Sequence, residues 1–159
     1  MDSIHKTIEE MMNDRGFIVN GDIATRDEET IYIKIIDSKK IGKREVITII
    51  QEMEEEEYQH LIIIIPQKLT PLAIQELKNT KKEIEVFIYK ELMFNITKHY
   101  TQPKMKILNK EEKYNLIQQI KQSQLPIILR ADPICRYYNA KPGDIFEFKR
   151  PSIYYRIVV

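Results

Sequence analysis

The chain has 159 residues, of which 43% are hydrophobic and 31% are charged, and its formal net charge is +1. This length predicts one domain or two small ones, with enough apolar residues to build a core. A single cysteine excludes an internal disulfide, and the longest apolar run, Leu61–Ile65, is too short to cross a bilayer. The polar N-terminal segment lacks an apolar signal core. We therefore expect an intracellular protein with no membrane partner.

Charge is distributed unevenly along the chain. Residues 1–101 carry 14 Lys and Arg against 19 Asp and Glu, a net charge of −5, whereas residues 102–159 carry 11 against 5, a net charge of +6. The contrast predicts two units with different neighbours. We expect the basic part to lie beside either a polyanion or an acidic protein surface.

The first part of the chain alternates helical and extended patterns. Apolar spacing predicts a first helix capped by Ser3 and stopped at Gly16, and the polar residues 20–30 predict turns. Three apolar runs predict strands over residues 30–36, 60–66 and 84–88. Amphipathic segments predict helices over residues 42–57 and 70–79, and a helical turn over 91–94. This order predicts a small three-layer α/β domain over residues 1–103.

The second part, residues 104–159, predicts a compact α+β domain. Asn109 and Glu112 resemble a capping box that begins a helix with Tyr114, Ile117 and Ile120 on its inner face. Further elements are predicted from apolar runs and turn residues: strands over 104–108, 127–129, 145–149 and 154–158, and a short helix over 134–138. The last two strands are expected to pair as a hairpin and to present a free edge to a partner.

Common catalytic and ligand-binding patterns are absent from the sequence. The three histidines lie in separate predicted elements, and the four glycines are isolated, which argues against a metal site and a phosphate loop. Cys135 lies between apolar positions with no histidine nearby in sequence, so we expect a buried packing residue. No catalytic residue, metal ligand or cofactor is predicted on this basis.

Two weaker patterns leave alternatives open. Asp22, followed one strand later by Asp37 and Lys39, resembles the layout of metal-dependent nucleases, although such residues are also common in polar turns. Thr70 and Pro71 begin a predicted helix, with Lys68 just before it. The free amides of such a helix start and one lysine could contact a DNA phosphate, or the segment is an ordinary capped helix.

Several motifs in order along the chain resemble a known family. The C-terminal part reads LP at 125–126, ADP at 131–133, RYY at 136–138, AKPGDIF at 140–146, RPS at 150–152 and YYRIVV at 154–159. The N-terminal part adds MNDRGF at 12–17, LTPLA at 69–73 and FNITKH at 94–99. Together they resemble the smaller common subunit shared by the nuclear RNA polymerases, whose C-terminal part corresponds to a small subunit of the archaeal RNA polymerase.

The chain departs from this family's pattern at three places. It is compact between Phe17 and Thr30, it has only Ser152 and Ile153 between KRP at 149–151 and YYRIVV at 154–159, and Asn139 stands where the family commonly has glycine. Asparagine tolerates the left-handed conformation, so this turn is expected to persist. A shortened chain rich in Ile, Lys and Glu suggests a version encoded by a large DNA virus of eukaryotes.

The resemblance implies a non-catalytic subunit of a multisubunit DNA-directed RNA polymerase, without a cofactor and monomeric within the complex. It implies an N-terminal jaw domain near downstream double-stranded DNA, contacted without sequence preference, and a C-terminal assembly domain that docks on the largest subunit. It places the protein in the nucleus if cellular, or in the virion or a cytoplasmic replication site if virus-encoded. The alternatives are a stand-alone nuclease using Asp22, Asp37 and Lys39, and a free transcription regulator.

Candidate contact residues follow from the matched motifs. The expected DNA-facing residues are Lys68, Thr70 and Pro71. Tyrosine and arginine are enriched as anchors of protein interfaces. The expected subunit interface is formed by Asp132, Pro133, Arg136, Tyr137, Tyr138, Gly143, Arg150, Pro151, Tyr155 and Arg156.

Overall fold

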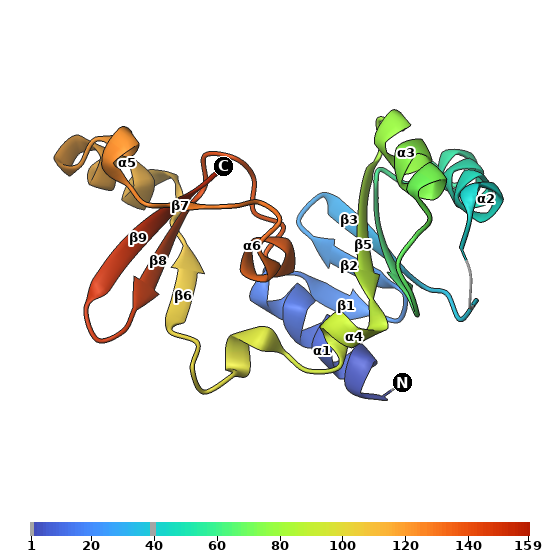
Figure 1. Cartoon of the computed structure of the whole chain (residues 1–159), viewed down its shortest axis with the longest axis horizontal. Coiled ribbons are helices and arrows are strands. Elements are labelled where there is room, and N and C mark those ends of the chain that lie inside the picture. The colour runs from blue at the N-terminus through green and yellow to red at the C-terminus, as the bar shows by residue number, and fades with distance from the viewer. Residues whose placement is uncertain (1, 39–40) are drawn as a thin grey trace. The chain divides into compact units, whose positions relative to one another are not determined.

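The computed structural model describes residues 2–38 and 41–159, and it divides into two compact units, Met1–Phe94 and Asn95–Val159 (Figure 1). We call these the N-terminal unit and the C-terminal unit. The division comes before the sequence-based boundary at residue 103. The reason is that Asn95 donates a hydrogen bond to the buried Tyr137 hydroxyl at 2.9 Å, and Ile96 packs against the C-terminal core.

The N-terminal unit is a five-stranded mixed sheet with helices. Its described elements are α1 (Asp2–Asp14), β1 (Ile18–Asn20), β2 (Ile23–Arg26), β3 (Glu29–Ile35), α2 (Lys43–Glu55), β4 (His60–Ile65), α3 (Pro71–Asn79), β5 (Glu83–Ile88) and α4 (Tyr89–Leu92). The strands lie in the order β1-β2-β3-β4-β5, with β3, β4 and β5 parallel and β1 and β2 antiparallel. The expected α/β architecture is confirmed.

The central strand β4 is covered on both faces. Leu61, Ile63 and Ile65 belong to one core cluster with residues of α2 and α3. Ile62 and Ile64 point the other way, because side chains alternate along a strand, and they are equally buried. Helices α2 and α3 lie on the first face, and α1 and α4 lie on the second (Figure 1). The continuous apolar run therefore produces the middle layer of a three-layer unit.

Helix α1 ends in a Schellman motif. Gly16 has a φ of +83°, a conformation that favours glycine. The Gly16 N–H donates to the Asn13 carbonyl at 2.9 Å, and the Phe17 N–H donates to the Met12 carbonyl at 2.9 Å. The predicted stop at Gly16 is confirmed. The predicted cap at Ser3 is wrong, because α1 already includes this residue.

Residues 20–30 form strands as well as turns, which corrects the sequence-based expectation. β1 and β2 pair as a short antiparallel ribbon, and β2 pairs with β3 in the same way. Gly21 with φ +63° and Asp27 with φ +51° lie in the two tight turns. Most side chains of β1 and β2 are exposed or half-buried, and Ala24 is the one that is fully buried. These strands therefore look polar in the sequence.

The C-terminal unit is a four-stranded sheet with short helices. Its elements are η1 (Ile96–Lys98), β6 (Lys104–Ile107), α5 (Lys110–Gln119), η2 (Gln122–Gln124), β7 (Ile127–Ile128), α6 (Pro133–Tyr137), β8 (Ile145–Lys149) and β9 (Ile153–Val158). The order is β6-β8-β9-β7, in which only β7 and β9 are parallel. The predicted final hairpin is confirmed, and the Arg150 N–H donates to the Ser152 carbonyl at 3.0 Å in its short turn.

Both faces of this sheet are covered in part. On one face, Leu116 of α5 packs with Ile145 and Ile157. On the other face, Ile134 and Cys135 of α6 pack with residues of the sheet such as Phe146. We call these the α5 face and the α6 face. The expected compact α+β unit is confirmed.

The buried side of α5 differs from the prediction. Leu116 is buried and Ile117 is half-buried, whereas Tyr114 is 65% exposed and Ile120 is 37% exposed. Two residues of separation correspond to about 200° around a helix, so Tyr114 and Leu116 lie on opposite sides.

Among the described residues, no helix is long and apolar enough to span a membrane.

Candidate assembly and nucleic-acid surfaces

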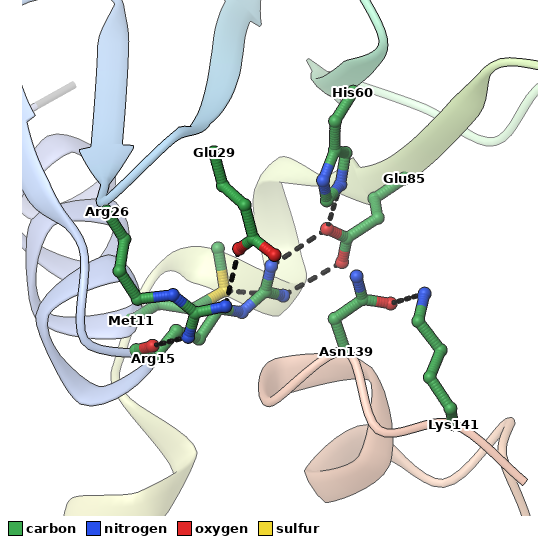
Figure 2. Close-up of polar contacts among 8 residues, drawn as sticks. All are labelled: Met11, Arg15, Arg26, Glu29, His60, Glu85, Asn139 and Lys141. Atoms are coloured by element: carbon green, nitrogen blue, oxygen red, sulfur yellow. Dashed lines mark hydrogen bonds and ion pairs between the residues drawn. The ribbon is translucent and has the colours of Figure 1, made fainter.

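The N-terminal unit holds a cluster of buried charges that joins α1 to the sheet (Figure 2). Arg15 donates two hydrogen bonds to the two carboxylate oxygens of Glu85 on β5, each at 2.8 Å. His60 Nε2 lies 2.8 Å from Glu85 Oε1. The side chains of Arg15 and Glu85 are only 4% and 12% exposed. This bidentate, largely buried geometry fixes the end of α1 against the sheet.

The pKa of Glu85 reflects two opposing causes. Burial alone raises the pKa of the carboxyl group, but hydrogen bonds from His60 and Arg15 and their charges outweigh it and hold the pKa below its ordinary value. An ionised carboxylate satisfied by two partners is suited to a structural role. Among residues 2–38 and 41–159, no three His, Cys, Asp or Glu side chains form a group that could hold a metal ion.

A neighbouring arginine continues this structural network. Arg26 donates to the Arg15 main-chain carbonyl at 2.7 Å, and its guanidinium lies 4.4 Å from the centre of the Phe17 ring. Arg26 Nη2 lies 2.5 Å from Glu29 Oε2 (Figure 2). These contacts anchor the β2–β3 turn to the end of α1.

The residues of the nuclease alternative are not brought together. Asp22 and Asp37 are both exposed, and the Asp22 carbonyl accepts a hydrogen bond from the Ile33 N–H at 2.8 Å. Asp37 lies four residues beyond Ile33, which is about 13 Å along an extended chain. Lys39 lies outside the described residues. The two carboxylates are therefore too far apart to share a metal ion, and the geometry does not favour this alternative.

Cys135 has the environment of a packing residue. It is 1% exposed within the core around α6. Burial, with smaller contributions from the charges of Asp132 and Asp144, raises the pKa of the thiol to about 11. A thiol held in the protonated form is a poor nucleophile. The prediction that Cys135 is a buried packing residue is confirmed.

The predicted DNA-facing residues lie in the loop between β4 and α3. Lys68 and Pro71 are exposed, and Thr70 Oγ1 accepts a hydrogen bond from the Ala73 N–H at 3.3 Å, so the predicted cap is confirmed. Pro71 has no N–H and the Ala73 N–H is used. Within the described contacts, Leu72 thus carries the one amide of the first turn that remains available to an anion.

Arg44 is a candidate that the sequence alone did not suggest. α2 follows β3 and α3 follows β4, and these strands are parallel, so both helices begin at the carboxyl end of the sheet. Arg44 in the first turn of α2 is exposed, as is Lys68 before α3. Lys43 pairs with Glu76 of α3 at 2.7 Å, which ties the two helices together. Recognising the parallel strand–helix repeat was the signal that could have identified Arg44.

Among the predicted interface residues, those around α6 differ in exposure. Asp132 Oδ1 accepts a hydrogen bond from the Ile134 N–H at 2.9 Å, so it caps α6, and Pro133 is exposed in the first turn. Arg136 is half-buried. Asp132 therefore has a role within the fold, whereas Pro133 offers surface.

The adjacent tyrosines contribute mainly to the core. Tyr137 is 3% exposed, and its hydroxyl accepts the hydrogen bond from Asn95. Tyr138 is half-buried, with its ring edge-on to Phe146 at 5.8 Å between centroids. A direct contact of Tyr137 with another protein would require exposure that this residue lacks.

Turn residues account for three more of the predicted set. Gly143 has a φ of +92° and its N–H donates to the Val158 carbonyl at 2.9 Å, so glycine is required by the backbone there. Arg150 Nη1 donates to the Thr101 carbonyl. Pro151 is exposed in the β8–β9 turn. Arg150 is exposed as well, so both it and Pro151 offer surface.

The last two predicted residues lie on opposite faces of β9. Tyr155 is half-buried and its hydroxyl donates to a Glu147 oxygen at 3.5 Å. Arg156 is exposed. The expectation that the last two strands present a free edge is wrong, because β9 lies between β8 and β7, and β8 lies between β6 and β9. The free edges of this sheet belong to β6 and β7.

Comparison with known proteins identifies relatives that match along nearly the whole chain. Residues 94–158 match the family RNA polymerase Rpb5, C-terminal domain. A Dictyostelium discoideum protein named subunit rpabc1 of DNA-directed RNA polymerases I, II and III is 31% identical, over 94% of this chain and 89% of the relative. The Caenorhabditis elegans subunit RPABC1 is 29% identical over 98% and 94% of the two chains. An Arabidopsis thaliana DNA-directed RNA polymerase subunit 5-like protein is 30% identical over 87% and 69%. The chain belongs to the Rpb5 (RPABC1) family of RNA polymerase subunits.

Proposed function

We propose that the protein is a non-catalytic subunit of a multisubunit DNA-directed RNA polymerase. The observation that carries the proposal is the alignment with RPABC1 subunits over 94% and more of the chain, which includes both units. The absence of a convergent catalytic cluster among the described residues is compatible with chemistry that takes place in another subunit. Such a subunit works as a monomer within the complex and without a cofactor. It acts in the nucleus of a cell, or in a virion or cytoplasmic replication site if a virus encodes it.

The C-terminal unit is proposed to dock on the largest polymerase subunit. Residues 95–159 carry 12 Lys and Arg against 5 Asp and Glu, so this unit fits an acidic protein surface. Its exposed candidates for the contact are Pro133, Arg150, Pro151 and Arg156. The family match over residues 94–158 coincides with this unit.

The N-terminal unit is proposed to form part of the lower jaw near downstream DNA. Lys68 and Arg44 are exposed near the starts of α3 and α2, at the carboxyl end of the sheet, and the Leu72 amide lies in the first turn of α3. Two cations and a helix start would contact phosphates rather than base edges. The contact would therefore position the duplex without reading its sequence.

The proposal is tested by isolating the tagged protein from its native source. A co-purifying polymerase of several hundred kilodaltons on gel filtration, with its largest subunit present, is the expected result. A small free species would instead favour the transcription regulator. DNA cleavage by the purified chain with Mg²⁺, abolished by Asp37→Ala, would restore the nuclease alternative despite the separation of Asp22 and Asp37.

Docking through the C-terminal unit has its own test. Arg156→Ala combined with Tyr155→Ala should lower incorporation into the polymerase without unfolding the N-terminal unit. Lys104→Ala is a control, because this exposed lysine lies on β6, at the other end of the sheet order. Equal incorporation of the double variant and the wild type would refute a contact through Arg156 and Tyr155.

A further inference from the structure

One edge of the C-terminal sheet has main-chain groups available for pairing. The carbonyls of Pro126 and Ile128 accept hydrogen bonds from β9 at 2.9 and 3.0 Å, and the Arg130 N–H donates to the Val159 carbonyl at 2.9 Å. Main-chain direction alternates along a strand, so Ile127 and Leu129 direct their N–H groups away from β9. β7 is the last strand of the sheet. We call residues 126–130 the β7 edge.

The side chains of the β7 edge divide by chemistry between the two faces of the sheet. Ile127 lies opposite Ile157 on the α5 face, and Leu129 follows on the same face. Ile127 and Leu129 are 58% and 59% exposed, whereas Ile157 is buried. The edge therefore presents two large apolar side chains on the α5 face, side by side with unused main-chain donors.

The α6 face of the same edge carries cations. Arg156 lies opposite Phe146, a core residue of this face. Arg130 lies at the end of the β7 edge, where the chain enters the turn closed by the Asp132 N–H and the Leu129 carbonyl. Both arginine side chains are exposed, and neither makes a hydrogen bond or ion pair with another described residue. The β7 edge is thus apolar on one face and cationic on the other.

We propose that an extended segment of the largest polymerase subunit adds to the β7 edge as a further strand of the C-terminal sheet. Strand addition satisfies main-chain groups and reads alternate side chains. The added segment would place apolar residues on the α5 face, against Ile127 and Leu129, and acidic residues on the α6 face, near Arg130 and Arg156. This inference rests on the proposed function and specifies the surface through which the subunit docks.

The structure also limits the length and identity of the added strand. Pro126 has no N–H, and the Leu129 carbonyl already accepts a hydrogen bond from the Asp132 N–H at 2.9 Å, so the available edge is short. A second copy of the chain is a poor occupant. Pairing two β7 edges about a two-fold axis perpendicular to the sheet would bring Arg156 of both copies to one face, where like charges repel.

The main-chain contact is tested by proline substitution in the full chain, co-expressed with the largest subunit. Ile127→Pro removes an outward N–H and leaves the bonds of Pro126 and Ile128 to β9 in place. We expect about tenfold weaker association, equivalent to about 1.4 kcal/mol. Ile127→Ala, which keeps the N–H, should weaken association less. Lys104→Glu on β6 is the matched edge control and should associate normally.

A second measurement guards against misfolding of the proline variant. Arg130→Glu should weaken association by a similar factor, and a photo-crosslinker at position 127 should label the largest subunit, whereas one at position 104 should not. Normal association of both Ile127→Pro and Arg130→Glu, or crosslinks from β6 alone, would overturn the inference. Failure of the wild-type chain to associate with any polymerase subunit would instead overturn the proposed function.

Discussion

The buried pair between Arg15 and Glu85 provides a direct test of how the N-terminal unit is held together. The substitution Glu85→Gln keeps the size of the side chain and one acceptor oxygen, but it removes the negative charge. Arg15, whose side chain is 4% exposed, would then keep a buried guanidinium without its counter-charge. The change alters little in shape, so its effect reports the electrostatic contact.

The expected cost follows from burial and geometry. Removing one partner of a buried ion pair costs about 3–5 kcal/mol of stability. Because the amide of the substituted glutamine keeps one acceptor oxygen for Arg15, we expect a cost near the lower limit of this range. For a unit of this size, each kcal/mol lowers the melting temperature by about 4–8 °C. Glu85→Gln should therefore lower the melting temperature of the N-terminal unit by about 12–24 °C.

The control is Glu29→Gln, because Glu29 also pairs with an arginine but the side chains of Arg26 and Glu29 are 42% and 63% exposed. An exposed pair contributes about 0–1 kcal/mol. Thermal unfolding by circular dichroism, with hydrogen exchange of α1 and β5 measured by mass spectrometry, locates the loss in the N-terminal unit. Equal shifts for Glu85→Gln and Glu29→Gln would refute the reasoning.

Three further predictions follow from the same structure. Because the pKa of Glu85 is held below its ordinary value, its contribution to stability is complete above about pH 4.3 and is lost as the pH falls through the native pKa. The free energy of unfolding, measured as the pH is lowered, should thus fall more steeply for the wild type than for Glu85→Gln. Lys68→Ala or Arg44→Ala in the assembled polymerase should each reduce the slope of log K for DNA against log salt by about 0.9, and an unchanged slope would remove that residue from the contact. Cys135, with its thiol pKa at about 11, should react slowly with iodoacetamide at pH 7 until urea unfolds the C-terminal unit, as measured by mass spectrometry.

The starts of α3 and α5 were predictable from the sequence because capping is local, although the cap predicted at Ser3 was wrong. Thr70 accepts from the amide three residues on, and Asp132 from the amide two residues on. Asn109 and Glu112 exchange hydrogen bonds at 2.9 and 3.0 Å as a capping box. Each of these hydrogen bonds joins residues at most three positions apart, so the residue types at those positions are enough to predict the cap.

Contacts between distant segments were beyond the sequence pattern. Arg15 and Glu85 are 70 residues apart, and no local spacing relates them. β2 was interpreted as part of a turn because Ala24 is its one fully buried residue, so the strand shows little apolar alternation. Tyr114 was placed on the inner face of α5 together with Ile117 and Ile120, which follow it at intervals of three residues, whereas Leu116 is the buried residue of this helix.

The candidate surfaces were predicted by residue type but not by exposure. Tyr137 and Arg156 were equivalent in sequence, as aromatic and cationic anchors, yet one is buried against Asn95 and the other is exposed. The β7 edge was not recognisable in the sequence, because its position depends on β7 pairing in parallel with β9 across a turn, a helix and the β8–β9 hairpin. Strand order decides which strand lies at an edge, and strand order is a property of the whole unit.

The overall charge of the N-terminal unit does not argue against the proposed DNA contact. Residues 1–94 carry 13 Lys and Arg against 19 Asp and Glu, so the unit as a whole should repel a duplex. The acidic run Glu54–Glu57, however, spans the end of α2, whereas Arg44 lies in its first turn. Arg44 and Glu54 are ten residues apart, which is about 15 Å along the helix axis, and exposed charges are screened over about 8 Å at physiological ionic strength. A phosphate at the start of α2 and α3 would therefore interact with Arg44 and Lys68 and only weakly with the distant glutamates, which requires the carboxyl end of the sheet to face the DNA.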